Sequence, residues 1–308
     1  MNEYVYITSR KNIREYLEDN FNNIKFISKT PSKSVLKRII KEILRENKKQ
    51  IIIEDYFVGI QEFIEKLNDL NITVKFIWIN GLATLNEEIE LSNLIEVLKL
   101  LETNKIKSLG FTENNIYEVY KDLKGVKKVS LTVKQVTKNK QQNNFNISIY
   151  GDAYDWRCNY FNQLSALKLL ENYNFVMLNS KIIVKRFCKF FNIKNKGNKQ
   201  KYNVSNFRKL IKDLNVASCV EFSNLSDLFI IDSYNHGVPT VVGNNSIFFK
   251  ETDLYNLVVV KSDDDINEIA DKIKYCFKNS KKIIKIYDKY KEKYDIECQK
   301  LIKDFIEE

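Results

Sequence analysis

The stretch VASCVEFSNLSDLFIIDSYNHGVPTVVGNNSIFF, residues 216–249, decides the fold of this chain. Two short apolar runs, Val216–Val220 and Thr240–Val242, are typical of buried strands because they are rich in β-branched residues and show little polar alternation. Between them lie a polar turn, a short helix that carries Asp232, and the turn sequence from Gly237 to Pro239. A strand, an acid-bearing loop, a helix and a second strand can form a ligand site at the strand ends of an open α/β sheet.

The same alternation of strands and amphipathic helices runs through the whole chain and predicts an α/β fold of two tandem Rossmann-like domains, each with a doubly wound parallel sheet. The expected strands of the first half are Tyr4–Ile7, Ile24–Ile27, Ile51–Ile53, Val74–Ile79, Ser108–Phe111 and Val129–Val133. Those of the second half are Ile147–Tyr150, Phe175–Leu178, Val216–Val220, Thr240–Val242 and Leu257–Val260. A length of 308 residues also favours two domains over one.

A polar, aromatic-poor segment, KQVTKNKQQNNFN, separates the two halves. We expect domains at residues 1–135 and 147–280, with a linker at 136–146, because the alternation of strands and helices restarts directly after it. A long surface loop is the alternative to a linker. A helical segment at 281–308 closes the chain and is expected to pack back on the first domain.

Charge and cysteine content narrow the functional class. The chain has 50 Lys and Arg against 40 Asp and Glu, a net charge of +10. This charge could attract an anionic partner, but the lysines are evenly spread, as on solvated helices. No basic stripe or stacking motif indicates a nucleic-acid partner. Five widely spaced cysteines without a CxxC pair favour a reducing cytoplasm over a disulfide framework or zinc site.

The N-terminal residues lack the apolar core of a signal peptide, and no apolar run is long enough to span a membrane. We therefore expect a cytoplasmic protein. His236 is the only histidine, which excludes a metal site built on a histidine pair, and it is expected to be a polar turn residue. The acidic run Asp263–Asp265 is expected to cap a helix rather than to bind a metal.

The segment that opens the second domain, ISIYGDAYDWRCN at 147–159, carries anion-binding features. A strand that ends at Gly151 is followed by Arg157 at a helix start, which sets a guanidinium beside free backbone N–H groups. Such a site attracts phosphate through charge and forked donors. Pairing of Arg157 with Asp152 or Asp155 is the alternative.

Two acids, Asp227 and Asp232, belong to the expected helix of the opening stretch. A carboxylate at the carboxyl end of a strand can accept hydrogen bonds from ribose or sugar hydroxyls. Asp227 is equally suited to cap the helix, whereas Asp232 lies inside it, where no cap is needed, so a functional role is favoured. Gly237 is expected to end the helix in a left-handed conformation.

Three motifs together resemble the donor-binding half of a GT-B glycosyltransferase of the retaining, group-1 kind, similar to glycosyltransferase family 4. IYGDAYDWRCN resembles the first donor-domain strand and the loop that holds the donor diphosphate. SNLSDLFIIDSYNHGVPTVVGN resembles the acid-x7-acid element with its G-[VT]-P-V-V sequence, and VVVKSDDDINEIADKIKYCF resembles the closing strand and helix. The resemblance covers residues 146–280; over 1–135 it rests on the alternation of strands and helices alone.

The resemblance implies a metal-independent glycosyltransferase without a cofactor. It would transfer a sugar from a nucleotide-diphosphate sugar to a glycan, lipid-linked or protein acceptor. The first domain would be the acceptor side and the second would bind the donor, with a cleft between them. The resemblance also implies a role in cell-surface glycan biosynthesis. The net positive charge would allow peripheral association with the inner face of the membrane.

The resemblance also assigns residues. The catalytic candidates are Arg157, which would neutralise the diphosphate, Asn224 at the position of the family's sugar-contacting acid, and Asp227 as its shifted substitute. The donor-binding candidates are Gly151, Arg157, Asn159, Lys181, Asp232 and Gly237, with Lys185 as a further helper.

Three of the sequence's departures from the family bear on activity. Asn224 replaces a glutamate, Asp152 stands where an arginine is usual, and Thr8–Lys11 occupies the place of a glycine-rich loop. These departures are the basis of the alternative function, a catalytically degenerate GT-B-like binding or scaffold subunit of a glycosyltransferase complex.

Overall fold

The computed structural model describes residues 4–138, 145–177, 182–196, 204–223, 227–246, 249–250 and 252–307. They divide into two compact units, of which the first holds Met1–Leu131 and Glu297–Glu308 and the second holds Thr132–Ile296. The first unit therefore ends four residues before the expected boundary at 135. Of the expected linker, residues 139–144 lie outside the described ranges.

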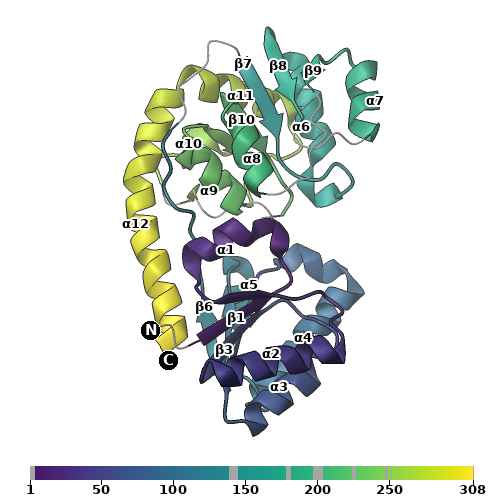
Figure 1. The fold of residues 1–308 in the computed structure, drawn as a ribbon. Coiled ribbons are helices and arrows are strands. Elements are labelled where there is room, and N and C mark those ends of the chain that lie inside the picture. The colour runs from purple at the N-terminus through teal and green to yellow at the C-terminus, as the bar shows by residue number, and fades with distance from the viewer. Residues whose placement is uncertain are drawn as a thin grey trace. The chain divides into compact units, whose positions relative to one another are not determined.

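Within the described residues, the first unit contains a six-stranded parallel sheet in the order β2-β1-β3-β4-β5-β6. Figure 1 shows β1, β3 and β6 of this sheet with the helices α1 to α5 beside them. Its strands are β1 (Tyr4–Thr8), β2 (Ile24–Phe26), β3 (Gln50–Glu54), β4 (Thr73–Trp78), β5 (Ser108–Phe111) and β6 (Val126–Lys128). Its helices are η1 (Lys11–Ile13), α1 (Arg14–Asn20), α2 (Lys33–Arg45), α3 (Ile60–Asp69), η2 (Leu82–Asn86), α4 (Glu88–Glu102) and α5 (Asn114–Tyr120).

The helices form where the apolar spacing predicts them. In α2, Ser32 caps the first turn by accepting a hydrogen bond from the Val35 backbone N–H at 3.4 Å. Ile39 and Ile43, one helical turn apart, are buried against the sheet in the hydrophobic core, while lysines occupy the other face.

The end of α12 (Ser280–Glu307) belongs to the first unit and is held there by a buried lysine. Lys75 on β4, 1% exposed, donates from Nζ to the carbonyl oxygens of Phe305 at 2.6 Å and Ile306 at 3.0 Å. The last carbonyls of a helix lack partners within the helix and carry partial negative charge, so a cation there is stabilising. Lys75 thereby fixes the closing residues of the chain against the first sheet.

In the described part of the second unit, a five-stranded parallel sheet has the order β11-β10-β7-β8-β9. Its strands are β7 (Phe145–Ile149), β8 (Tyr173–Val176), β9 (Asn195–Lys196), β10 (Val216–Cys219) and β11 (Thr240–Val242). Its helices, besides α12, are η3 (Trp156–Cys158), α6 (Tyr160–Ala166), η4 (Leu167–Leu169), α7 (Ile182–Phe190), α8 (Val204–Ile211), α9 (Asp227–Asn235), α10 (Tyr255–Val258) and α11 (Ile266–Lys278). The predicted α/β class with two parallel sheets is confirmed.

Some expected elements are wrong. The expected strand at Leu257–Val260 is instead the end of α10 followed by a single bridge between Val242 and Val259. An apolar run of four residues is compatible with either a strand or a helical turn. When every residue of a run is apolar, the run shows neither the period of a strand nor that of a helix. The expected strand at Val129–Val133 lies just after β6, which is Val126–Lys128.

All five cysteines are buried thiols. Among the described residues, none of the helices has both the length and the apolar character needed to cross a membrane.

Candidate functional site

The second sheet has a topological switch point between β7 and β10. From β7 the chain proceeds to β8 and β9 on one side, and then returns to β10 and β11 on the other. Ligands of open α/β sheets bind at the carboxyl ends of such strands. The loops that follow β7 and β10 meet here, since the Phe222 backbone N–H donates to the Arg157 carbonyl oxygen at 2.8 Å.

Gly151 makes the turn that directs the first of these loops. It has a φ of +106°, which side-chain-bearing residues rarely adopt. A Cβ at this position would lie 2.7 Å from Cβ and 2.9 Å from Sγ of Cys158. The glycine is therefore required for η3 to pack under the turn, which keeps the loop close to the strand ends.

Arg157 is engaged by a neighbouring acid. Its Nε lies 2.8 Å from Oδ1 of Asp155 and its Nη2 lies 2.7 Å from Oδ2, a forked pair. Asp155 also caps η3 by accepting the Arg157 backbone N–H at 3.0 Å, and hydrogen bonds from Arg157 hold the pKa of this carboxyl below its ordinary value. The ion-pair alternative is thus present in the structure, and the diphosphate role of Arg157 stays a prediction.

Two other predicted donor-binding residues have structural contacts. Asn159 adopts a left-handed φ of 48° and its buried side-chain amide donates to the Asp263 carbonyl oxygen. Gly237, with a φ of +84°, ends α9: its N–H donates to Tyr234 O at 2.9 Å, and Val238 N–H donates to Ser233 O at 3.0 Å. The expectation that Gly237 ends the helix is confirmed.

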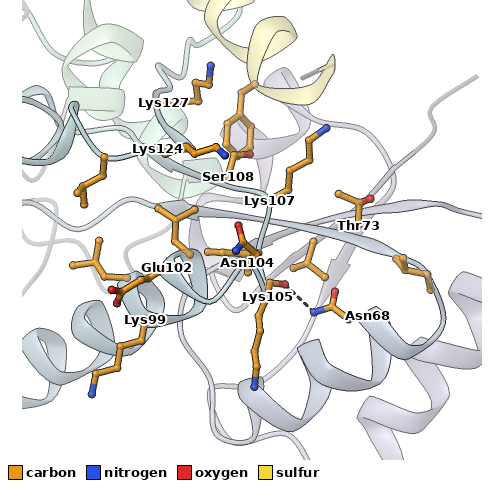
Figure 2. Close-up of a pocket in the computed structure, with 18 of the residues that line it drawn as sticks. Asn68, Thr73, Lys99, Glu102, Asn104, Lys105, Lys107, Ser108, Lys124 and Lys127 are labelled. Carbon is orange, nitrogen blue, oxygen red and sulfur yellow. Dashed lines mark hydrogen bonds between the residues drawn. The ribbon is translucent and has the colours of Figure 1, made fainter.

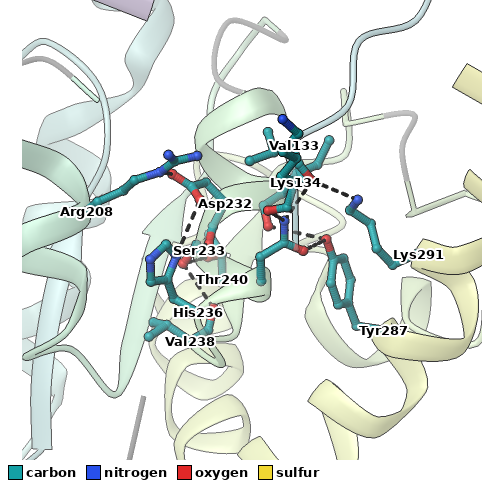
Figure 3. Close-up of polar contacts among 12 residues, drawn as sticks. Val133, Lys134, Arg208, Asp232, Ser233, His236, Val238, Thr240, Tyr287 and Lys291 are labelled. Carbon is teal, nitrogen blue, oxygen red and sulfur yellow. Dashed lines mark hydrogen bonds and ion pairs between the residues drawn. The ribbon is translucent and has the colours of Figure 1, made fainter. Parts of the chain in front are cut away.

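Asp232 lies at the centre of a buried polar cluster (Figure 3). Its carboxylate is fully buried and accepts a hydrogen bond at Oδ2 from Nε of Arg208, on α8, at 2.8 Å. His236 Nδ1 lies 3.3 Å from Oδ1 and 2.8 Å from the Asp232 carbonyl oxygen. Burial alone would raise the pKa of Asp232, but the hydrogen bonds from His236 and Arg208 outweigh it, and the pKa is lowered.

No local pattern in the sequence indicates the partnership between Arg208 and Asp232. Arg208 lies on α8, 24 residues before Asp232 in the sequence, and only the packing of α8 beside α9 brings the two side chains together. His236 does lie in the turn after α9, as expected, with its ring 5% exposed against Asp232.

An aromatic shelf formed by Trp156 and Phe222 lies where the two loops meet. The Trp156 side chain is 64% exposed and Phe222 is 38% exposed, and their ring centroids are 6.4 Å apart. Exposed aromatic faces beside a switch point can stack on a flat ligand such as a nucleobase. The signal in the sequence is a tryptophan within a polar loop at a strand end.

Asp227 is the first residue of α9, where a carboxylate complements the helix dipole. Asn224 and Lys181 lie outside the described residues. Asp265 caps α11 by accepting backbone N–H groups of Asn267 and Glu268, which confirms the capping prediction for the acidic run. In the parts of the chain that the structure describes, no group of three or more His, Cys, Asp or Glu side chains is arranged to hold a metal ion.

The first unit has its own switch point, between β1 and β3, with a buried polar cluster. Glu54, 1% exposed, accepts a hydrogen bond from Tyr6 Oη at 2.7 Å, and Arg10 Nε lies 3.2 Å from its other oxygen. Arg10 also donates to Asp55 at 3.0 Å. Burial raises the pKa of Glu54 to about 7, against the opposing charge of Arg10. Arg10 lies in the Thr8–Lys11 segment, where the resemblance implied a glycine-rich loop.

Replacing Glu54 by Gln is expected to change how stability depends on pH. The folded pKa of about 7 exceeds the ordinary 4.5, so the folded protein binds this proton more tightly, and stability falls as pH rises between these values. As the pH rises from 4.5 to about 7, the free energy of unfolding of the variant should increase by about 3 kcal/mol relative to that of the unsubstituted chain. Urea unfolding of both proteins from about pH 5 to about pH 8 measures this. The exposed control is Glu118→Gln. If the difference in free energy of unfolding between Glu54→Gln and the unsubstituted chain is the same at every pH, as expected for this control, the raised pKa of Glu54 is contradicted.

Comparison with known proteins gives a match in fold. The sequence matches no protein-family model and no curated protein. HepE from Anabaena, solved with UDP-glucose, superposes with a TM-score of 0.67 at 9% identity over 98% of both chains. Sucrose-phosphate synthase from Thermosynechococcus elongatus superposes with a TM-score of 0.66 at 10% identity, over 88% of this chain and 74% of the synthase. A glycosyltransferase from Rickettsia africae gives 0.61 at 13% identity, over 98% and 99%.

HepE and sucrose-phosphate synthase are GT-B glycosyltransferases. The chain therefore has the GT-B fold, and the resemblance inferred from the motifs of the second domain is confirmed at the level of fold.

Proposed function

We propose that this protein is a glycosyltransferase that uses a nucleotide-diphosphate sugar and binds it at the switch point of the second sheet. The observation that carries the proposal is the meeting of the β7 and β10 loops at that point, with Gly151 opening the turn and the Trp156–Phe222 shelf exposed above it. The GT-B fold supports it, since HepE was solved with UDP-glucose. A base stacked on the shelf would extend its diphosphate toward Arg157.

The chemistry requires that negative charge on the departing diphosphate be neutralised. Arg157 is 15% exposed and already arranged as a fork on Asp155, so a phosphate group can replace that carboxylate without changing the geometry of the guanidinium. We assign Asp232 to positioning, because its carboxylate is fully buried and a ribose contact would require Arg208 to leave. Arg208, whose side chain is 25% exposed, would then be the group that meets the donor.

The finer points follow the resemblance. We propose a metal-independent reaction, with a glycan, lipid-linked or protein acceptor bound at the carboxyl edge of the first sheet beside Arg10 and Glu54. A place in cell-surface glycan biosynthesis, on the cytoplasmic side and peripheral to the membrane, would fit the positive net charge of +10.

Substituting Trp156 by Ala is expected to weaken binding of UDP or another nucleoside diphosphate by about tenfold, because a stacking contact with a base contributes roughly 1–3 kcal/mol. A panel of UDP, GDP, ADP and TDP, measured by thermal shift and then by calorimetry, identifies the base. The matched control is Phe190→Ala, which removes an aromatic ring that is 82% exposed on α7 of the same unit. Equal affinities of the two variants would rule out the shelf as the base site.

A second candidate is the degenerate binding subunit. It is favoured by two ion pairs that engage the predicted donor ligands, Arg157–Asp155 and Arg208–Asp232, and by the asparagine at position 224. The two candidates differ in turnover. A sugar nucleotide that binds and is neither transferred nor hydrolysed over long incubation identifies the degenerate protein, whereas release of the nucleoside diphosphate identifies the enzyme.

A further inference from the structure

A cavity of about 1260 Å³ opens in the first unit at the amino edge of its sheet (Figure 2). Thr73 and Ser108, the first residues of β4 and β5, line it, together with Lys127 of β6 and Phe305 of α12. Because the strands are parallel, this edge is the opposite one from the Arg10–Glu54 cluster. The cavity is therefore separate from the proposed acceptor site and from the donor site in the second unit.

The cavity is strongly basic. Five lysines and one acid line it, namely Lys99, Lys105, Lys107, Lys124, Lys127 and Glu102 (Figure 2). Lys105 also pairs with Glu65, outside the lining, so its charge is shared. A concave surface lined mainly by one sign of charge concentrates ions of the other sign, and ammonium groups are compact cations suited to phosphate.

Besides the polar Asn68, Asn71, Asn104, Thr73 and Ser108, the remaining lining is largely apolar. Ile106 and Phe305 are each 1% exposed. Ile95 and Leu123 also line the cavity but are 44% and 48% exposed. A ligand with an apolar chain would cover these two side chains, and removal of their apolar surface from water would favour binding. The lining therefore suits a molecule with an anionic end and an apolar body.

Ser108 supplies an independent indication of a ligand. The residue is 6% exposed, and within the described part of the chain its Oγ has no hydrogen-bond partner. A buried hydroxyl without a partner is unfavourable, and such groups usually have one in native proteins. Since Ser108 also lines the cavity among the lysines, a phosphate oxygen bound there would accept its hydrogen bond.

We propose that this cavity binds a phosphate group carried on an apolar chain. Lysine ammonium groups, chiefly those of Lys107 and Lys124, would hold the phosphate beside Ser108, and the chain would lie along Ile95 and Leu123. The phosphate could be that of a soluble amphiphile or of an anionic lipid in a bilayer. This site is additional to the proposed transferase function and does not depend on it.

The test uses the full chain and three probes: inorganic phosphate, dihexanoyl phosphatidic acid as monomers, and vesicles of phosphatidylcholine with or without phosphatidylglycerol. We expect dihexanoyl phosphatidic acid to bind and the double variant Lys107→Gln/Lys124→Gln to weaken this binding at least about tenfold, with a smaller salt dependence. Ser108→Ala should weaken it by roughly tenfold to a hundredfold, the effect of one hydrogen bond to a charged group. Binding to monomers alone indicates a soluble ligand, and additional binding to phosphatidylglycerol vesicles indicates a lipid surface.

The control is Lys37→Gln/Lys41→Gln, which removes the same charge from α2 of the same unit. If this control loses as much affinity for dihexanoyl phosphatidic acid as Lys107→Gln/Lys124→Gln does, the proposed site is overturned, since net charge alone would then explain binding. No binding of dihexanoyl phosphatidic acid would also overturn it, as would inorganic phosphate binding with equal affinity, because the apolar wall would then contribute nothing. Circular dichroism melting of each variant shows that it remains folded, and Ser108→Ala, a small change, keeps the proposal testable if the lysine variant unfolds.

Discussion

Asp232→Asn is expected to lower the free energy of unfolding of the second unit by about 3 kcal/mol, because it leaves the Arg208 guanidinium without its carboxylate in a largely buried site. The Asp232 side chain is 0% exposed and that of Arg208 is 25% exposed, which places the value at the lower end for a broken buried pair. For a unit of this size, the midpoint of thermal unfolding should fall by roughly 6–12 °C. Differential scanning calorimetry at neutral pH measures it.

The control for this prediction is Asp271→Asn. Asp271 pairs with Lys274 on α11 at 3.4 Å, but its side chain is 76% exposed, so its loss should change stability by less than about 0.5 kcal/mol. The effect should also depend on pH. The pKa of Asp232 is lowered, so its contribution is present above the ordinary value of 3.8 and is lost as pH falls through the folded pKa. The difference in free energy of unfolding between Asp232→Asn and the unsubstituted chain should therefore become smaller in acid. A difference that does not change with pH would argue against the ion pair.

Gly151→Ala is the second substitution with a large expected effect. The alanine would adopt a φ of +106° and place its Cβ 2.7 Å from Cys158 Cβ, so strain of the backbone and overlap with a buried side chain add together. We expect a loss of about 3 kcal/mol in stability, measured by urea unfolding. Binding of a nucleoside diphosphate should weaken as well, because the loop that follows β7 shifts.

Gly237→Ala separates the two causes. Gly237 also has a positive φ, +84°, but its nearest contact for an added Cβ is Lys138 Cβ at 3.5 Å, an ordinary distance. Backbone strain alone should reduce stability by about 1 kcal/mol. If Gly151→Ala is no more destabilising than Gly237→Ala, the packing of Cys158 under the turn is not what requires a glycine.

Much of the fold could be predicted from the alternation of apolar strands and amphipathic helices. The order of segments in a parallel α/β domain determines most of its architecture, and ten of the eleven expected strand positions fall at or beside strands of the structure. The prediction of a strand at Leu257–Val260 was wrong, because a helical turn followed by a single bridge buries these valines equally well. The attachment of α12 through Lys75 could not be read from the sequence, since 230 residues separate that lysine from Phe305.

The site was less predictable. Gly237 and Asp265 were recognised because helix ends have local signatures. The pairing of Arg157 with Asp155 was one of two local alternatives, and only side-chain geometry distinguishes them. Arg208 was missed because its partnership with Asp232 depends on the contact between two helices. The Trp156–Phe222 shelf depends on two loops that are distant in sequence and meet at the switch point.

The most direct test of the central claim locates the bound donor by hydrogen–deuterium exchange of the full chain, with and without a saturating nucleotide-diphosphate sugar such as UDP-glucose. We expect slower exchange in the loop that follows β7, residues 150–159, and in the loop that follows β10, residues 220–223, with little change in β4 and β5 of the first unit. Absence of protection with every sugar nucleotide tested, or protection in the second unit confined to segments away from these two loops, would contradict it.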